Sequence, residues 1–153
     1  MKIKIILLII CLGVIVFIWG NSILSPELSS EFSRVVGEIV SSLFGTGNAT
    51  ETVGGISIRK MAHFVEFFAL GVAIMSLLTI SVKRLSVKCY FVAFLGLLIP
   101  VIDETIQLFS NRGSSLRDVW IDVGGYILGC SLAWGAFALC KKLIKRGKNN
   151  NKK

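Results

Sequence analysis

The chain alternates between long apolar runs and short polar clusters, and four of the apolar runs are long enough to cross a bilayer. Apolar stretches of about 18 or more residues are typical of membrane-spanning helices. The runs cover residues 3–19 (reaching 21 if its polar end is included), 58–80, 90–108 and 119–140. We therefore predict an all-α integral membrane protein built as a four-transmembrane-helix bundle.

The segment between the first two runs predicts an extra helix of a different kind. Ser25-Pro26-Glu27 has the composition of a helix start, with a capping residue, a proline and an acid in the first turn. Apolar residues then recur at helical spacing up to Gly45, which indicates an amphipathic helix in the first outer loop. Residues 46–55 read as a flexible link. A lid over a polar site and a simple surface connector both fit this segment.

Charge sets the expected orientation of the bundle. The chain has 17 lysines and arginines and a formal net charge of +8. With the N-terminus inside, twelve of these cations fall on the inner side and five on the outer side, as the positive-inside rule favours. We predict that both termini are cytoplasmic. Because the cations flank the spans instead of forming one patch, they do not indicate a nucleic-acid partner.

Composition supports one membrane domain. The chain is 54% hydrophobic and 17% charged, with a mean hydropathy of +0.75. We assign residues 1–145 to a single four-span domain and residues 146–153 to a basic disordered tail. Lys2 and Lys4 before an apolar run also resemble a signal peptide, but the run is longer than usual, so we expect an uncleaved first helix. The four cysteines lack metal-like spacing and read as small apolar residues.

Three polar clusters interrupt the last three spans. They cover residues 59–66, 103–107 and 112–122, and under the predicted topology all three lie at the outer ends of their helices. A charge within a bilayer helix costs roughly 2.5–3.5 kcal/mol on insertion scales. Five carboxylates, four cations and the single histidine in such places indicate a site on the extracytoplasmic side.

Helical spacing aligns the members of each cluster. Arg59, His63 and Glu66 share one face of the second span because they are four and three residues apart. In the fourth span, the two aspartates share a face with Gly125 and Gly129, whose spacing allows close helix approach. The candidate catalytic residues are His63, Glu66 and Asp103. The candidate ligand-binding residues are Arg59, Lys60, Glu104, Gln107, Arg112, Asp118 and Asp122.

Several chemistries fit this polar layer. His63 could act as a general base oriented by Glu66 or Asp103, and the arginines suit a phosphate. A metal held by the histidine and the acids has little support, since there is one histidine and no HExxH pattern; we expect no metal and no cofactor. A structural ion-pair network is the plain alternative, because the cations and carboxylates nearly cancel.

The same residues resemble the VanZ-like family of bacterial membrane proteins. The matching segments are RKMAHFVEFFALG at 59–71, DETIQLF at 103–109 and RGSSLRDVWIDVGGYILG at 112–129. Two departures are Asp122, where the family pattern suggests asparagine, and Asn111, where a Pro-Gly pair is common. The namesake of the family is associated with low-level resistance to the glycopeptide teicoplanin, and the resemblance supplies no reaction.

The resemblance and the polar layer together give the expected function. We expect a multi-pass protein of the bacterial cytoplasmic membrane that binds or modifies an outer-leaflet lipid or a lipid-linked cell-wall-precursor headgroup. Its partners would be membrane lipids, and it could form oligomers. Whether it is an enzyme stays open. The alternatives are a small dimeric proton-coupled transporter and a purely structural bundle. Transport is disfavoured because the inner half of each span is uniformly apolar.

Overall fold

Within the residues that the computed structural model of the protein describes, four long helices form most of the fold. The described residues are 2–23, 34–35, 38–39, 42, 52–53, 56–110 and 115–150. In chain order, the elements are α1 (Lys2–Ile23), β1 (Thr52–Val53), β2 (Ile56–Ser57), α3 (Ile58–Ser81), α4 (Leu85–Phe109) and α5 (Leu116–Asn150). Each of the four helices is long and apolar enough to cross a membrane, which confirms the predicted four-helix bundle.

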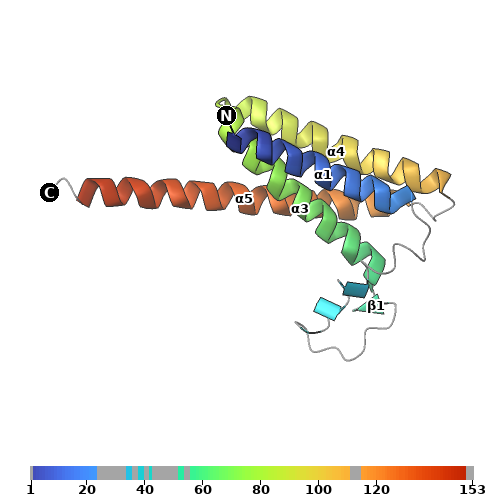
Figure 1. The fold of residues 1–153 in the computed structure, drawn as a ribbon. Helices are drawn as coiled ribbons and strands as arrows, with labels where there is room; N and C mark the ends of the chain where they lie inside the picture. The colour runs from blue at the N-terminus through green and yellow to red at the C-terminus, as the bar shows by residue number, and fades with distance from the viewer. Residues whose placement is uncertain are drawn as a thin grey trace.

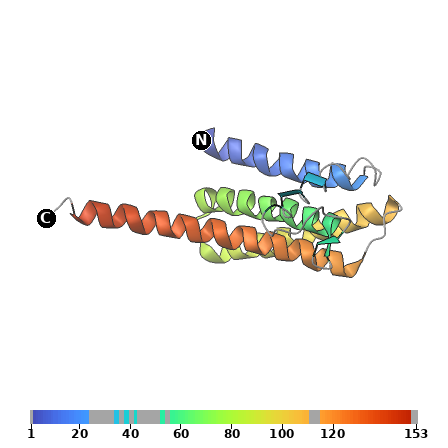
Figure 2. The same cartoon turned by 90° about the horizontal axis from the view of Figure 1, so that it is seen from below.

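The helices pack as an antiparallel bundle with α3 at its centre. α3 contacts the other three helices, while α1 and α5 pack on either side of it (Figure 1, Figure 2). The buried core lies mainly along α3 and includes Phe67, Leu70 and Ile74, with Ile18 of α1 and Tyr126 of α5. Many large apolar side chains on α1, α4 and α5 are exposed, as expected for helices whose outer faces contact lipid tails.

The closest packing joins α3 to α5 through glycines. A Cβ atom added to Gly125 would lie 2.4 Å from the Phe64 carbonyl oxygen, and one added to Gly129 would lie 2.1 Å from that of Phe68. Both distances are far below van der Waals contact, so only glycine permits this approach. The predicted close packing at Gly125 and Gly129 is therefore confirmed. Gly71 of α3 plays the same part against the Tyr126 carbonyl oxygen, and the sequence pattern did not single it out.

Two features of the fold differ from the sequence predictions. β1 and β2 form a small antiparallel ladder in which Thr52 pairs with Ser57 and Val53 with Ile56. Thr52 and Val53 fall in the segment expected to be a flexible link. The two residues between the strands in sequence are Gly54-Gly55, a pair favoured in two-residue hairpin loops, and this signal was overlooked.

The second difference is the length of α5. Residues 146–150, expected in a disordered tail, belong to this helix. Lysine and arginine are good helix formers, and adding residues to an existing helix is favourable. In Figure 1, α5 extends well beyond the other helices, at the end of the bundle where both termini lie.

Most of the expected amphipathic helix in the first loop lies outside the described residues. Of this segment, Arg34, Val35, Glu38, Ile39 and Ser42 are described and helical. Arg34 forms a 2.6 Å ion pair with Glu38 one turn away.

Candidate functional site

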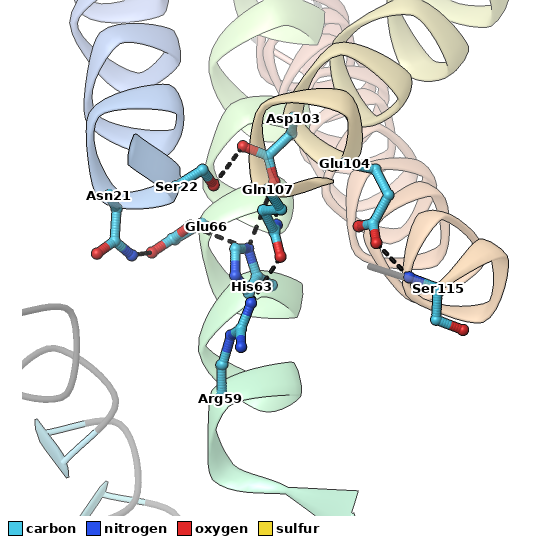
Figure 3. A network of polar contacts seen from close by, with 9 residues as sticks. All are labelled: Asn21, Ser22, Arg59, His63, Glu66, Asp103, Glu104, Gln107 and Ser115. Carbon is cyan, nitrogen blue, oxygen red and sulfur yellow. Dashed lines mark hydrogen bonds and ion pairs between the residues drawn. The ribbon is translucent and has the colours of Figure 1, made fainter. Parts of the chain in front are cut away.

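The polar residues of all four helices meet at the end of the bundle opposite the two termini. They come from the last turn of α1, the first half of α3, the last turns of α4 and the first turns of α5 (Figure 3). The antiparallel order of the helices produces this gathering. The structure therefore brings the sequence-predicted clusters of α3, α4 and α5 together, as their equal expected depth implied.

His63 of α3 lies between two carboxylates. Its Nδ1 atom is 3.5 Å from Oε2 of Glu66 and 3.8 Å from Oδ2 of Asp103. All three side chains are buried, with relative exposures of 8%, 3% and 0%. Glu66 shares the face of α3 with His63, as the spacing predicted, and Asp103 reaches the ring from α4. Both carboxylates lie close enough to the ring to orient it.

Asp103 is held by hydrogen bonds from two helices. The hydroxyl of Ser22 donates to its Oδ1 atom at 2.6 Å, and the amide nitrogen of Gln107 donates to its Oδ2 atom at 2.8 Å. The amide oxygen of Gln107 accepts a 2.6 Å hydrogen bond from Arg59. A continuous chain of polar contacts thus runs from α1 through α4 to α3, and it fixes the Asp103 carboxylate in one orientation (Figure 3).

The sequence predictions missed the contribution of α1. Asn21 donates a 2.8 Å hydrogen bond to Oε1 of Glu66, and Ser22, which is fully buried, donates to Asp103. Both residues stand at the polar end of the first apolar run, where they read only as the end of a span. The sequence could have indicated this role, because Asn21 and Ser22 are two hydrogen-bonding residues at the end of a run that is otherwise apolar.

Polar contacts hold the N-terminal end of α5 against α4 and α3. The backbone N–H of Ser115 donates to Glu104 of α4, and the Ser115 carbonyl accepts from the Asp118 N–H at 2.8 Å. Asp118 lies in the first turn, where a negative charge interacts favourably with the helix dipole. Its carboxylate forms a 2.6 Å ion pair with Lys60 of α3. These contacts place two sequence-predicted acids at the same helix start.

A cavity of about 240 Å³ opens between these helices. Its lining includes the two cations of α3 and the two aspartates of α5, and in full it consists of Arg59, Lys60, His63, Gln107, Ser115, Asp118, Ile121 and Asp122. Six of the ten candidate residues from the sequence therefore line one cavity. Such concave sites with convergent polar groups are typical of ligand binding.

Asp122 stands at the buried side of this cavity. It is 1% exposed, and its Oδ2 atom has no hydrogen-bond partner among the described residues. Ligand atoms of His63, Asp103 and Asp122 all lie within 4.8 Å of one another. Gly125, less than one turn along α5, lets the α5 backbone approach α3, and this packing brings Asp122 close to the histidine.

The structure describes only part of the set of charges expected at the site. Arg112 lies outside the described residues, and Arg117 is exposed and does not line the cavity. Among the described residues, Arg59 and Lys60 are the cations that line it, and Asp118 and Asp122 are the carboxylates. The near-cancellation of four cations and five acids stays a prediction, because Arg112 lies outside the described residues. Arg117 stays outside the cavity although its sequence neighbour Asp118 lines it, because neighbouring residues of a helix point to different faces.

Comparison with known proteins gives one family. The VanZ/LLP1 family model matches residues 5–140, which include α3 and α4 in full, most of α1 and α5, and every residue of the cavity. Comparison with curated proteins and with solved structures gave no match. The match spans most of the chain and agrees with the four apolar helices and with the motifs on α3, α4 and α5. The chain is a multi-pass membrane protein that belongs to the VanZ/LLP1 family.

Proposed function

We propose that this VanZ-family protein binds the anionic headgroup of a membrane amphiphile, a lipid or a lipid-linked cell-wall precursor. One observation carries the proposal: α5 lines both a cavity with two cations in its wall and an apolar groove. Trp120 and Val123 line the groove, and Ile121 and Asp122, at the same level of the helix but on another face, line the cavity. A molecule whose charged head enters the cavity and whose apolar chain passes around α5 fits this pair of sites.

The two cations are well placed for a phosphate-like group. Lys60 and Asp118 form their ion pair with 39% and 22% of the side chains exposed, so an incoming anion can reach the ammonium group. Arg59 donates its hydrogen bond to the Gln107 amide oxygen, a neutral partner that an anionic headgroup can replace. Arginine binds phosphate oxygens through two parallel hydrogen bonds, and lysine acts as a point charge.

The groove supplies a place for the chain of the amphiphile. It has a volume of about 640 Å³ and runs between α4 and α5 within the membrane-spanning part of both helices. Its lining is almost entirely apolar and includes Val92, Leu97, Val123 and Ile127. Because this surface faces the hydrocarbon region, an acyl or prenyl chain can enter it without loss of hydration.

His63 favours a second version in which the bound headgroup is also modified. A buried histidine flanked by two carboxylates is suited to proton transfer, and His63 lines the same cavity as the cations. In this version His63 removes or delivers a proton at the headgroup, while Glu66 and Asp103 orient the ring. The transporter alternative gains no support, since the polar groups gather at one end of the bundle and the groove beside them is apolar.

The cellular setting follows from the charge asymmetry. We propose that the chain resides in the bacterial cytoplasmic membrane, with both termini in the cytoplasm and the cavity on the extracytoplasmic side, because twelve of its 17 cations lie toward one side. This places the cavity where cell-wall precursors are used. A link to teicoplanin susceptibility is the corresponding phenotype to test.

Native mass spectrometry of the detergent-purified protein tests the binding proposal. The probes are phosphatidylglycerol, a polyprenyl phosphate, and phosphatidylcholine with the same acyl chains as the first. We expect adducts with the two anionic probes, at most weak adducts with phosphatidylcholine, and about tenfold weaker anionic binding for Lys60→Gln, since a charged hydrogen bond contributes about 1.5–3 kcal/mol.

Arg117→Gln is the matched control. It removes a cation from the same end of the bundle, but Arg117 is exposed and outside the cavity lining. The control should bind as the wild type does. Equal binding of phosphatidylcholine, or an equal loss in Arg117→Gln and Lys60→Gln, would contradict a specific headgroup site. The choice between the two anionic probes distinguishes an ordinary lipid from a cell-wall carrier.

A further inference from the structure

Three buried side chains from three helices converge on one point. His63 comes from α3, Asp103 from α4 and Asp122 from α5, and an atom of each able to bind a metal lies within 4.8 Å of the others. Their relative exposures are 8%, 0% and 1%. One imidazole and two carboxylates are ligands that suit divalent transition metals such as Zn²⁺ and Mn²⁺.

Asp122 gives an independent reason to expect a ligand at this point. Its Oδ2 atom is buried and has no hydrogen-bond partner among the described residues, although its side chain lines the cavity. Leaving a buried carboxylate oxygen without a partner is costly. A divalent cation at this point would also compensate the negative charge of the two buried carboxylates of Asp103 and Asp122.

Asp103 has the supporting contacts of a metal ligand. Metal-binding carboxylates accept further hydrogen bonds from their neighbours. Asp103 accepts hydrogen bonds from Ser22 and Gln107, and its Oδ2 atom lies 3.8 Å from Nδ1 of His63. Its side chain is thus already fixed in position by neighbours on α1 and α4.

We propose that His63, Asp103 and Asp122 bind one divalent transition-metal ion, with Zn²⁺ or Mn²⁺ as the fitting ions. The sequence alone led us to expect no metal, because it has one histidine and no HExxH pattern; the convergence of Asp103 and Asp122 on that histidine is visible only in the packed helices. Three protein ligands leave coordination positions for water or for an anion, as in catalytic metal sites. The metal site does not depend on headgroup binding, but an ion here would add a third positive group to the cavity of Arg59 and Lys60.

Metal content and affinity of the intact chain test this inference without any lipid or reaction. The detergent-purified protein is dialysed against a chelator, then titrated separately with Zn²⁺, Mn²⁺ and Mg²⁺ by calorimetry, and the bound metal is counted by elemental mass spectrometry. We expect about one Zn²⁺ or Mn²⁺ per chain and weaker binding of Mg²⁺, which prefers all-oxygen sites.

Asp122→Asn and Asp118→Asn form the matched pair of variants. Both remove one carboxylate from α5 and from the wall of the same cavity, but only Asp122 belongs to the group of three. Asp122→Asn should weaken binding at least about tenfold, whereas Asp118→Asn should change it little. His63→Gln provides a second ligand variant if Asp122→Asn does not yield monodisperse protein.

The outcomes separate the metal site from the headgroup site. Absence of stoichiometric Zn²⁺ and Mn²⁺ binding in the wild type overturns the metal site, whatever the lipid experiment gives. Equal weakening by Asp122→Asn and Asp118→Asn also overturns it, because it would indicate nonspecific attraction to the acidic cavity. Metal binding that is lost in Asp122→Asn and kept in Lys60→Gln supports it, even if no headgroup binds.

Discussion

Replacement of Gly129 by alanine should separate α3 from α5 and lower the stability of the bundle. The added Cβ atom would lie 2.1 Å from the Phe68 carbonyl oxygen and 3.0 Å from the Val72 nitrogen. Both contacts are with backbone, which cannot rotate away as a side chain can. An ordinary contact of carbon with oxygen needs more than about 3 Å, so the helices must move apart by roughly 1 Å along this seam.

The expected loss in the free energy of unfolding can be derived from the known effects of overpacking. Inserting a methyl group into a well-packed contact typically costs about 1–3 kcal/mol, and the better helix propensity of alanine returns about 0.5–1 kcal/mol. A net loss of about 1–2 kcal/mol corresponds to a fall of roughly 2–8 °C in Tm, using the scaling for soluble chains of this size. The measurement is the loss of the monodisperse gel-filtration peak after heating in detergent.

Gly135→Ala is the control for this prediction. Gly135 is on the same helix, and nothing lies within 4 Å of an added Cβ. The control should melt at the wild-type temperature or slightly above it, because alanine favours the helix. If Gly129→Ala were as stable as Gly135→Ala, the close backbone approach of α3 and α5 would be refuted, and so would the reasoning that places Asp122 beside His63.

Three further results are expected. Ser22→Ala should lower the Tm, because it removes a 2.6 Å hydrogen bond to the fully buried Asp103 carboxylate, an interaction worth about 1.5–3 kcal/mol; an unchanged Tm would contradict the anchoring of α1. Lys60→Ala should lower the free energy of unfolding by less than about 1 kcal/mol, because the ion pair of Lys60 with Asp118 is partly exposed and weak. The variant should nevertheless lose a teicoplanin-related or other envelope phenotype. A severe loss of folded protein would instead favour a structural role for Lys60. In a cysteine-free background, a single cysteine at residue 48 should react with an impermeant maleimide on intact cells while one at residue 86 should not, and the reverse result would invert the topology.

The architecture could be predicted because the length of an apolar run is a local property. Runs of sufficient length gave the four spans, and helical spacing alone placed His63 beside Glu66. Gly125 and Gly129 were found by their spacing of four residues, whereas Gly71, a single glycine in an apolar run, carried no such signal although its approach to α5 is as close.

The connections between helices could not be predicted in the same way. The hydrogen bond from Ser22 to Asp103 joins residues 81 positions apart, and nothing in either segment specifies the other. The same holds for the three residues proposed to bind a metal. The sequence places Asp122 on the face of α5 that packs against α3, but the distances among three helices decide which carboxylates reach His63. Local patterns therefore identify the polar faces, and tertiary packing selects the partners.

The length of α5 affects how far its C-terminal end extends into the aqueous phase. Thirty-five helical residues at about 1.5 Å each span roughly 52 Å, whereas a bilayer with its headgroups is about 40–45 Å thick. The basic residues beyond Cys140 therefore belong to a continuous helix and not to a flexible tail. Lys148 lies about 9–10 Å farther along the axis than Lys141 and Lys142, slightly more than the screening length of about 8 Å at physiological salt. The charges at the start of this stretch would therefore act on a nearby lipid surface more strongly than Lys148 would.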